Sequence, residues 1–168
     1  ARAGVTELQI DEPYYSGFPE DLPWAVKAIN AATEGVDAHV TLHICYGNYQ
    51  RKRLFPGTYR ELFPAVLGAQ TSQLVLEFAV DDLAQFDAIV GQFPQTLELG
   101  LGVVDVKTDD LETPEGVAAR LRHALTRIPA ERLNKVNEGS PHAVDALRDG
   151  SIQLVVNTTR GAKEIRDS

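Results

Sequence analysis

The chain has 168 residues, of which 43% are hydrophobic and 24% charged, so it is long enough to bury the core of one compact domain. Its 24 acidic and 16 basic residues give a formal net charge of -8, which argues against nucleic acid or an anionic membrane as a partner. No apolar run approaches the roughly 20 residues that cross a bilayer, and no secretory signal opens the chain, so a cytoplasmic location is expected.

Apolar segments rich in β-branched residues alternate along the chain with stretches of helical spacing. The expected strands are residues 6–10, 38–45, 73–78, 97–106, 133–136 and 152–157. Helices are expected to start after side chains that can cap a first turn, namely Asp21, Thr58, Asp81 or Asp82, Thr113 and Ser140. Because parallel neighbours need long crossovers, the pattern predicts a single α/β domain over residues 1–168, with βα repeats and a mostly parallel sheet of about six strands.

Polar side chains share one face of the second expected strand. Side chains alternate along a strand, so His39, Thr41, His43 and Cys45 point the same way. An imidazole and a thiolate near the carboxyl end of a parallel strand are good zinc ligands, and Glu77, which closes the next apolar strand, is a third candidate. The same spacing also fits a partly solvated histidine, a core cysteine and a loop carboxylate. Cys45 is the only cysteine, so the chain forms no internal disulfide.

Two other expected strands also end in charged side chains. Asp11 follows the first strand and precedes Glu12 and Pro13, which places a carboxylate at a strand end, although a turn or helix cap would use the same residue. Asp105 and Lys107 alternate onto one face of the fourth strand. These two side chains could form an inward ion pair, which is more often structural than catalytic.

Four motifs in a fixed order extend the argument to a known family. They are Gln-Ile-Asp-Glu-Pro at 9–13, His-Ile-Cys-Tyr-Gly-Asn-Tyr at 43–49, Leu-Val-Leu-Glu-Phe-Ala at 74–79 and Gly-Leu-Gly-Val-Val-Asp-Val-Lys at 100–107. Together they resemble the later strands of the zinc barrel in cobalamin-independent methionine synthases, where zinc activates the homocysteine thiol for attack on the methyl group of methyltetrahydrofolate. The resemblance implies that His43, Cys45 and Glu77 are zinc ligands and that Asp11 recognises the homocysteine amine.

The sequence departs from that family in two respects. The family closes its zinc shell with a second cysteine on the last barrel strand, whereas this chain carries Asn-Lys-Val-Asn-Glu-Gly at 134–139 and no second cysteine. The early barrel strands, which supply much of the substrate site, have no counterpart here. Zinc with three protein ligands and an open water position is chemically sound, but we expect it to be bound weakly or not at all.

The last part of the chain resembles a different family. Residues 130–142, followed by Leu-Val-Val-Asn-Thr-Thr-Arg-Gly at 154–161, are similar to the methylglyoxal-synthase-like domain that ends carbamoyl phosphate synthetase large subunits. That domain is flavodoxin-like and binds nucleotide effectors. The resemblance implies that Lys135, Asn157, Thr158 and Thr159 contact a phosphate or nucleotide, although a turn and a cap explain these residues equally well.

Taken together, the two resemblances predict an engineered chimera. A methionine-synthase-like barrel fragment would span residues 1–130 and a carbamoyl-phosphate-synthetase-like fragment residues 131–168. The main hypothesis is a folded scaffold with no catalytic residues and no activity of either parent. The alternatives are a zinc-thiolate site like that of the homocysteine methyltransferases and a weak phosphate- or nucleotide-binding module. Open sheet edges would favour a homodimer.

Overall fold

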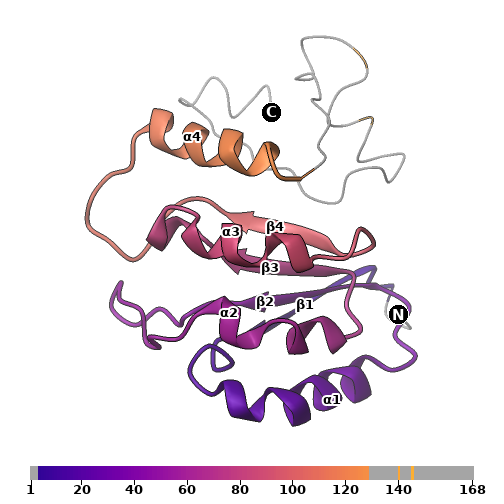
Figure 1. Cartoon of the computed structure of the whole chain (residues 1–168). Coiled ribbons are helices and arrows are strands. Elements are labelled where there is room, and N and C mark those ends of the chain that lie inside the picture. The colour runs from indigo at the N-terminus through magenta and orange to yellow at the C-terminus, as the bar shows by residue number, and fades with distance from the viewer. Residues whose placement is uncertain (1–3, 129–139, 141–144, 146–168) are drawn as a thin grey trace. The chain divides into compact units, whose positions relative to one another are not determined.

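Four parallel strands form the sheet around which the chain is organised. β1 (Glu7–Glu12), β2 (His39–Ile44), β3 (Gln73–Glu77) and β4 (Glu98–Gly102) lie side by side in the order β1-β2-β3-β4. The computed structural model describes residues 4–128 together with Ser140 and Asp145 (Figure 1). The predicted α/β class and parallel sheet are confirmed for this part of the chain, whereas the strands expected at 133–136 and 152–157 lie outside it.

The chain divides into two units, residues 1–128 and 129–168, and the first unit contains the whole four-stranded sheet. Of the second unit, the structure describes only Ser140 and Asp145, whose Oγ and Oδ2 atoms lie 2.8 Å apart. The expectation of one domain over residues 1–168 stays a prediction.

Helices connect successive strands. α1 (Leu22–Thr33) follows β1, α2 (Tyr59–Leu62) follows β2, α3 (Ala84–Ile89) follows β3, and α4 (Pro114–Leu125) follows β4. Short 3-10 turns at Pro19–Asp21, Ala65–Gly68, Ala79–Asp81 and Val90–Gln92 complete the connections. Figure 1 shows α2 and α3 in front of the strands that they join. These repeated βα units are consistent with a fragment of a TIM barrel.

Two of the predicted helix starts are confirmed by hydrogen bonds to the cap. Thr58 forms a capping box with Glu61, whose carboxylate accepts from the Thr58 amide at 3.0 Å. Thr113 Oγ1 accepts from the Gly116 amide at 3.1 Å and so caps α4. In both cases a short polar side chain satisfies an amide that the first helical turn leaves without a partner.

The other two described helix starts differ from the prediction. Asp21 precedes α1 but its side chain makes no capping bond, because a 3-10 turn leads directly into the helix. Asp81 and Asp82 do not cap α3, which begins at Ala84 after two left-handed residues, Asp82 and Leu83. The Asp82 carboxylate instead pairs with Arg120 of α4 at 2.9 Å.

The fourth strand is shorter than the sequence predicted. Residues 97–106 were expected to be extended, but β4 ends at Gly102. Beyond that point backbone amides bond to carboxylates: the Asp105 amide donates to Glu112 at 2.7 Å, and the Lys107 amide donates to Asp105 Oδ1 at 2.8 Å. Side-chain acceptors close by thus replace the ladder and turn the chain away from the sheet.

The two faces of the sheet differ in polarity. Val40, Leu42 and Ile44 of β2 are buried, as are Leu74 and Leu76 of β3, and these side chains pack under the helices. The opposite face carries charged and polar side chains near the strand ends: Glu7 is paired with His39, Asp11 is paired with His43, and Glu77 lies opposite Gly102. At the amino ends of the strands, His39 lies between the carboxylates of Glu7 and Glu98, at 2.9 and 3.1 Å.

A row of buried aromatic rings forms the centre of the core. Tyr46 packs against Tyr59 with ring centroids 4.8 Å apart, Tyr59 against Phe78 at 5.5 Å, and Phe78 against Phe86 at 5.6 Å. All four side chains are fully buried. The row joins the ends of β2 and β3 to α2 and α3, so the position of each strand end depends on this packing.

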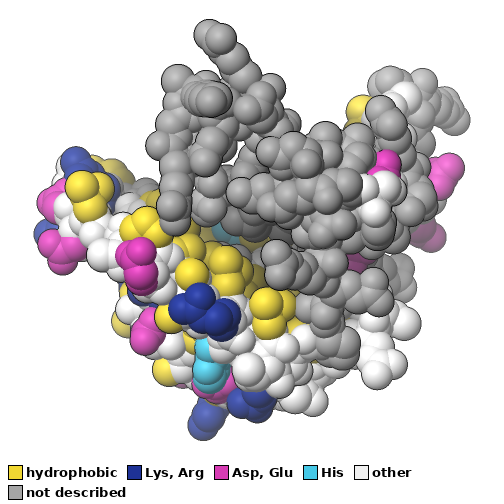
Figure 2. All heavy atoms as spheres, turned by 90° about the horizontal axis from the view of Figure 1, so that it is seen from above, with side chains coloured by type: hydrophobic (Ala, Val, Ile, Leu, Met, Phe, Trp, Pro, Cys, Tyr) yellow, Lys and Arg dark blue, Asp and Glu magenta, His cyan; other side chains and the backbone are white. Residues whose placement is uncertain are grey.

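Helix α4 is less buried than the helices α1, α2 and α3. Ala124 is its one buried residue, whereas Leu125 on the same helix is 58% exposed. Figure 2, which looks from above the view of Figure 1, shows hydrophobic side chains exposed among charged ones on this side of the molecule.

Candidate functional site

The candidate site is formed where β1, β2 and β3 end. Asp11 lies near the end of β1, opposite His43 of β2. Cys45 follows the last residue of β2, and Glu77 is the last residue of β3. Because Ile44 is paired with Leu76, Cys45 and Glu77 leave the sheet from adjacent positions. The predicted residues of the barrel fragment thus come from one edge of the sheet, which is where α/β proteins usually place their sites.

Asp11 and His43 are in direct contact. Asp11 Oδ1 lies 3.0 Å from His43 Nδ1 and accepts from Gln9 Nε2 at 2.7 Å. The hydrogen bonds from Gln9 and then from His43 lower the pKa of Asp11 below its usual value. A neutral His43 that donates its Nδ1 hydrogen to Asp11 keeps the Nε2 lone pair free for a metal ion, which is the common arrangement of zinc-binding histidines.

The two carboxylate oxygens of Glu77 differ in their contacts. Oε2 pairs with the Lys107 ammonium, and the two side chains are only 19% and 6% exposed. Oε1 is buried and has no hydrogen-bond partner among the residues that the structure describes. The side chains of Asp105 and Lys107, which could have paired with each other, have other partners: Asp105 accepts from the backbone amide of Lys107, and the Lys107 ammonium donates to Glu77 of β3.

Cys45 provides a half-buried free thiol. Its carbonyl oxygen accepts from Ser16 Oγ at 2.9 Å, which ties the end of β2 to the segment after β1. Ser16 is itself buried, so this hydrogen bond fixes the position of the Cys45 backbone. The sulfur atom remains available as a ligand.

The side chains of His43, Cys45 and Glu77 are chemically suited to bind zinc, but they do not converge on one point. A histidine nitrogen, a cysteine sulfur and a carboxylate oxygen are the ligand types that zinc prefers, and the partnerless Glu77 Oε1 is a buried acceptor that a cation would satisfy. Within residues 4–128, however, no three such side chains converge closely enough to form a metal cluster. A bound zinc ion would therefore require side-chain movement at the strand ends.

The side chain of Tyr59 was not recognised as part of this site from the sequence. Its hydroxyl donates to the Ile44 carbonyl at 2.8 Å and accepts from the Glu77 amide at 2.9 Å. Burial raises the pKa of Tyr59 well above its usual value, so the hydroxyl stays protonated and can serve as donor and acceptor together. No pattern in the sequence indicates that the Tyr59 hydroxyl bonds to two strands, because a tyrosine at the start of a helix is usually just part of its apolar face.

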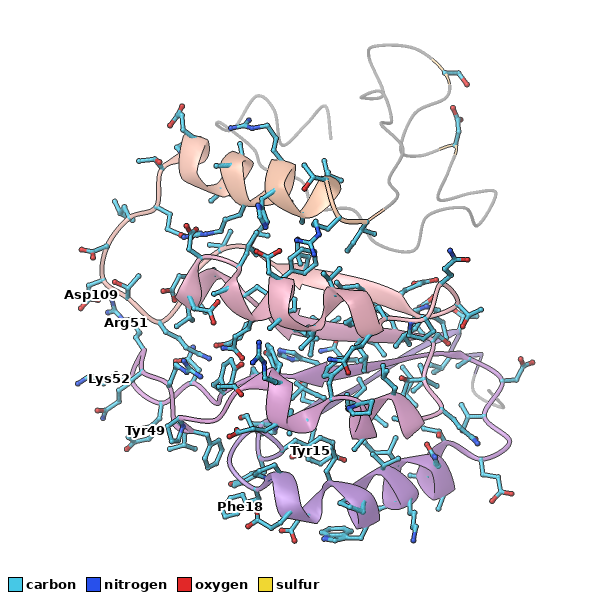
Figure 3. The ribbon with its side chains drawn as sticks, viewed as in Figure 1. Tyr15, Phe18, Tyr49, Arg51, Lys52 and Asp109 are labelled. Atoms are coloured by element: carbon cyan, nitrogen blue, oxygen red, sulfur yellow. The ribbon has the colours of Figure 1, made fainter. Side chains whose placement is uncertain are left out.

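A tight hairpin follows the site after β2. Tyr49 and Lys52 exchange backbone hydrogen bonds of 3.1 and 3.0 Å, and the two residues between them, Gln50 and Arg51, have left-handed backbone conformations. Arg51 pairs with Asp109 from the segment after β4, and Figure 3 shows these two side chains together at one side of the molecule. The hairpin thus links the segments that follow β2 and β4.

A separate hollow of about 580 Å³ lies beside β1 and α1. Its walls include Ile10, Tyr15, Phe18, Trp24 and Ile29, and Figure 3 labels Tyr15 and Phe18 among them. The lining contains two carboxylates but neither a histidine nor a cysteine, so it does not contribute the candidate zinc donors.

The predicted anion-binding residues cannot be placed in this site. They lie outside the described residues, and their role stays a prediction: Lys135, Asn157, Thr158 and Thr159.

In the described part of the chain, no helix is both long enough and apolar enough to cross a membrane.

Comparison with known proteins identifies relatives of the chain. The family model for the catalytic domain of cobalamin-independent synthases matches residues 1–137. Methionine synthase from Thermococcus kodakarensis is 33% identical over 165 residues, which are 98% of this chain and 45% of that protein. Methionine synthase from Saccharolobus solfataricus is 34% identical over 131 residues, or 78% of this chain and 36% of that protein. The chain therefore spans less than half the length of these curated relatives.

The comparisons do not support the predicted chimera. The similarity to the Thermococcus protein covers 165 of the 168 residues and so extends well beyond residue 130, where the second parent was expected to begin. Nothing in these comparisons supports a carbamoyl phosphate synthetase segment or an engineered origin. The second resemblance rested on residues 130–142 and 154–161, of which the structure describes only Ser140.

Proposed function

Because this chain belongs to the family of cobalamin-independent synthase catalytic domains, we propose that its strand ends form part of a zinc-thiolate site for methyl transfer to a thiol such as homocysteine. The observation that carries this proposal is the position of Glu77. Its buried Oε1 has no hydrogen-bond partner among the described residues, and it stands next to Cys45 on the adjoining strand.

In this proposal His43, Cys45 and Glu77 hold the zinc ion. Bound zinc supplies a Lewis acid that keeps a coordinated thiol ionised near neutral pH. His43 would bind through Nε2, because Nδ1 faces Asp11. Cys45 is the one cysteine among these 168 residues, and in this proposal a water molecule or the substrate thiol occupies the fourth position.

Asp11 has two roles in the proposal. Its Oδ1 atom orients His43, and its 68% exposed carboxylate remains accessible to the ammonium group of an amino-acid substrate. The lowered pKa of Asp11 keeps the carboxylate ionised at the pH where such an amine is protonated, so the two groups attract each other. This role for Asp11 follows from the family resemblance together with its position at the end of β1.

A metal titration tests the proposal directly. Cobalt(II) is added at pH 8 to the full chain and to the Cys45→Ser, His43→Gln and His39→Gln variants, and the thiolate-to-cobalt absorption band is followed. We expect one cobalt ion per wild-type chain, loss of the band in Cys45→Ser, and weaker binding in His43→Gln. His39→Gln is the matched control, because His39 lies on the same strand face but at the amino end of β2.

The same titration distinguishes this proposal from the scaffold hypothesis. A scaffold without parental activity would bind no cobalt at this site, and the spectra of wild type and Cys45→Ser would be identical. Adding homocysteine to the cobalt-loaded wild type should intensify the thiolate band, because a second sulfur enters the open position. If the band does not change, the protein has a metal site but does not bind the proposed thiol substrate there.

A further inference from the structure

The pairing of β2 and β3 ends with Ile44 and Leu76, next to the point where the candidate ligands leave the sheet. The Glu77 amide and the Ile44 carbonyl face each other across the two strands, where a direct hydrogen bond would continue the ladder. The Tyr59 hydroxyl bonds to both groups, at 2.9 and 2.8 Å, and so joins the ends of the two strands. Two hydrogen bonds of this length through one oxygen atom limit how far apart the amide and the carbonyl can lie.

The position of the Tyr59 hydroxyl is fixed from several directions. The Tyr59 amide donates to Gln85 Oε1 at 2.7 Å, and the ring is fully buried between Tyr46 and Phe78. The capping box at Thr58 sets the start of α2 and hence the direction from which the ring enters. The hydroxyl is therefore a rigid spacer and not a mobile side chain that happens to lie near the sheet.

Glu77 is also confined from the opposite side. Gly102 of β4 is paired with Glu77, and a Cβ atom at Gly102 would come within 2.8 Å of the Leu76 carbonyl oxygen and 3.0 Å of Glu77 Cα. The end of β3 thus lies between the Tyr59 hydroxyl and the closely packed backbone of β4.

We propose that Tyr59 is a positioning residue that sets the separation of Cys45 and Glu77 by inserting its hydroxyl between the ends of β2 and β3. It touches neither substrate nor metal. Without the hydroxyl, the two strand ends either close to a direct hydrogen bond or leave a buried amide and carbonyl unpaired, and in both cases the relative position of the two donors changes. The metal-binding part of this inference rests on the function proposed above.

Tyr59→Phe tests the inference, with Tyr46→Phe as its matched control. Tyr46 is equally buried in the same row of rings, but its hydroxyl bonds to Gln85 and bridges no strands. We expect cobalt(II) affinity to fall about 10-fold or more in Tyr59→Phe, as is typical when a group that orients a ligand is removed, and to change less than about 2-fold in Tyr46→Phe. Equal losses in both variants would show that Tyr59 is merely structural.

Amide hydrogen exchange provides a readout that needs no metal. In Tyr59→Phe we expect the Glu77 amide hydrogen to exchange about 10-fold faster, or the nitrogen chemical shift of this amide to change clearly. In Tyr46→Phe we expect both quantities to stay as in the wild-type protein. If the wild-type protein binds no cobalt, the proposed function is wrong. The exchange rate of the Glu77 amide then decides by itself whether Tyr59 sets the separation of the two strand ends. An unaltered Glu77 amide in Tyr59→Phe would overturn the inference whether or not cobalt binds.

Discussion

Replacing Phe78 with alanine is expected to lower the free energy of unfolding by about 3–5 kcal/mol, the usual cost of removing a buried phenyl ring. Phe78 is fully buried, and its ring makes edge contacts with Tyr59 and Phe86, at centroid distances of 5.5 and 5.6 Å. These neighbours belong to α2 and α3, so the cavity left by the ring would open at the centre of the core. Denaturant unfolding followed by circular dichroism measures the loss.

Tyr49→Ala is the control for the Phe78 variant. Tyr49 is also aromatic but is 66% exposed at the hairpin after β2, so its truncation should change stability by no more than about 0.5 kcal/mol. A loss below 1 kcal/mol for Phe78→Ala would contradict the aromatic row as the centre of the core.

Replacing Lys107 with methionine is the second change with a large expected effect. The ammonium is the ion-pair partner of Glu77, and both side chains are largely buried, so the substitution leaves a carboxylate in the protein without its counter-charge. Removing one partner of a buried ion pair typically costs about 3–5 kcal/mol, and the 19% exposure of Glu77 places this case near the lower value. Equilibrium unfolding near neutral pH checks this expectation.

A double variant separates charge from packing in that experiment. Lys107→Met with Glu77→Gln removes both charges at nearly constant volume and should recover most of the stability lost in the single variant. If the double variant is no more stable than Lys107→Met alone, the loss comes from packing around the lysine stem and not from an unpaired carboxylate.

The four described strands and two helix caps could be predicted because they depend on short stretches of sequence. The alternation of residues 38–45 gave β2 and placed His43 and Cys45 on one face, and Thr58 and Thr113 cap the helices that follow them. These features need only local periodicity and one side-chain oxygen. The predicted end of β4 was wrong because carboxylates of the following segment accept from its backbone amides. The predicted start of α3 was wrong because Asp82 pairs with Arg120 of α4 instead of capping the helix.

The sequence predicted where the candidate residues lie along the strands, but not which side chains they contact. Asp11, His43, Cys45 and Glu77 were found at strand ends, yet the sequence could not show that Asp11 contacts His43 or that Lys107 pairs with Glu77. Both pairs join different strands or loops, so they depend on the register of the sheet. Tyr59 was missed for the same reason, since its hydroxyl acts on two strands from a helix between them in the chain.

Zinc K-edge X-ray absorption of the full chain tests most directly whether these strand ends form a zinc-thiolate site. The protein is loaded with zinc at pH 8 in a reductant that contains no thiol. The account predicts one sulfur at about 2.3 Å with nitrogen and oxygen neighbours near 2.0–2.2 Å, a second sulfur after addition of homocysteine, and loss of the protein sulfur in Cys45→Ser. A shell of nitrogen and oxygen alone in the wild-type protein, or a sulfur that persists in Cys45→Ser, would contradict it.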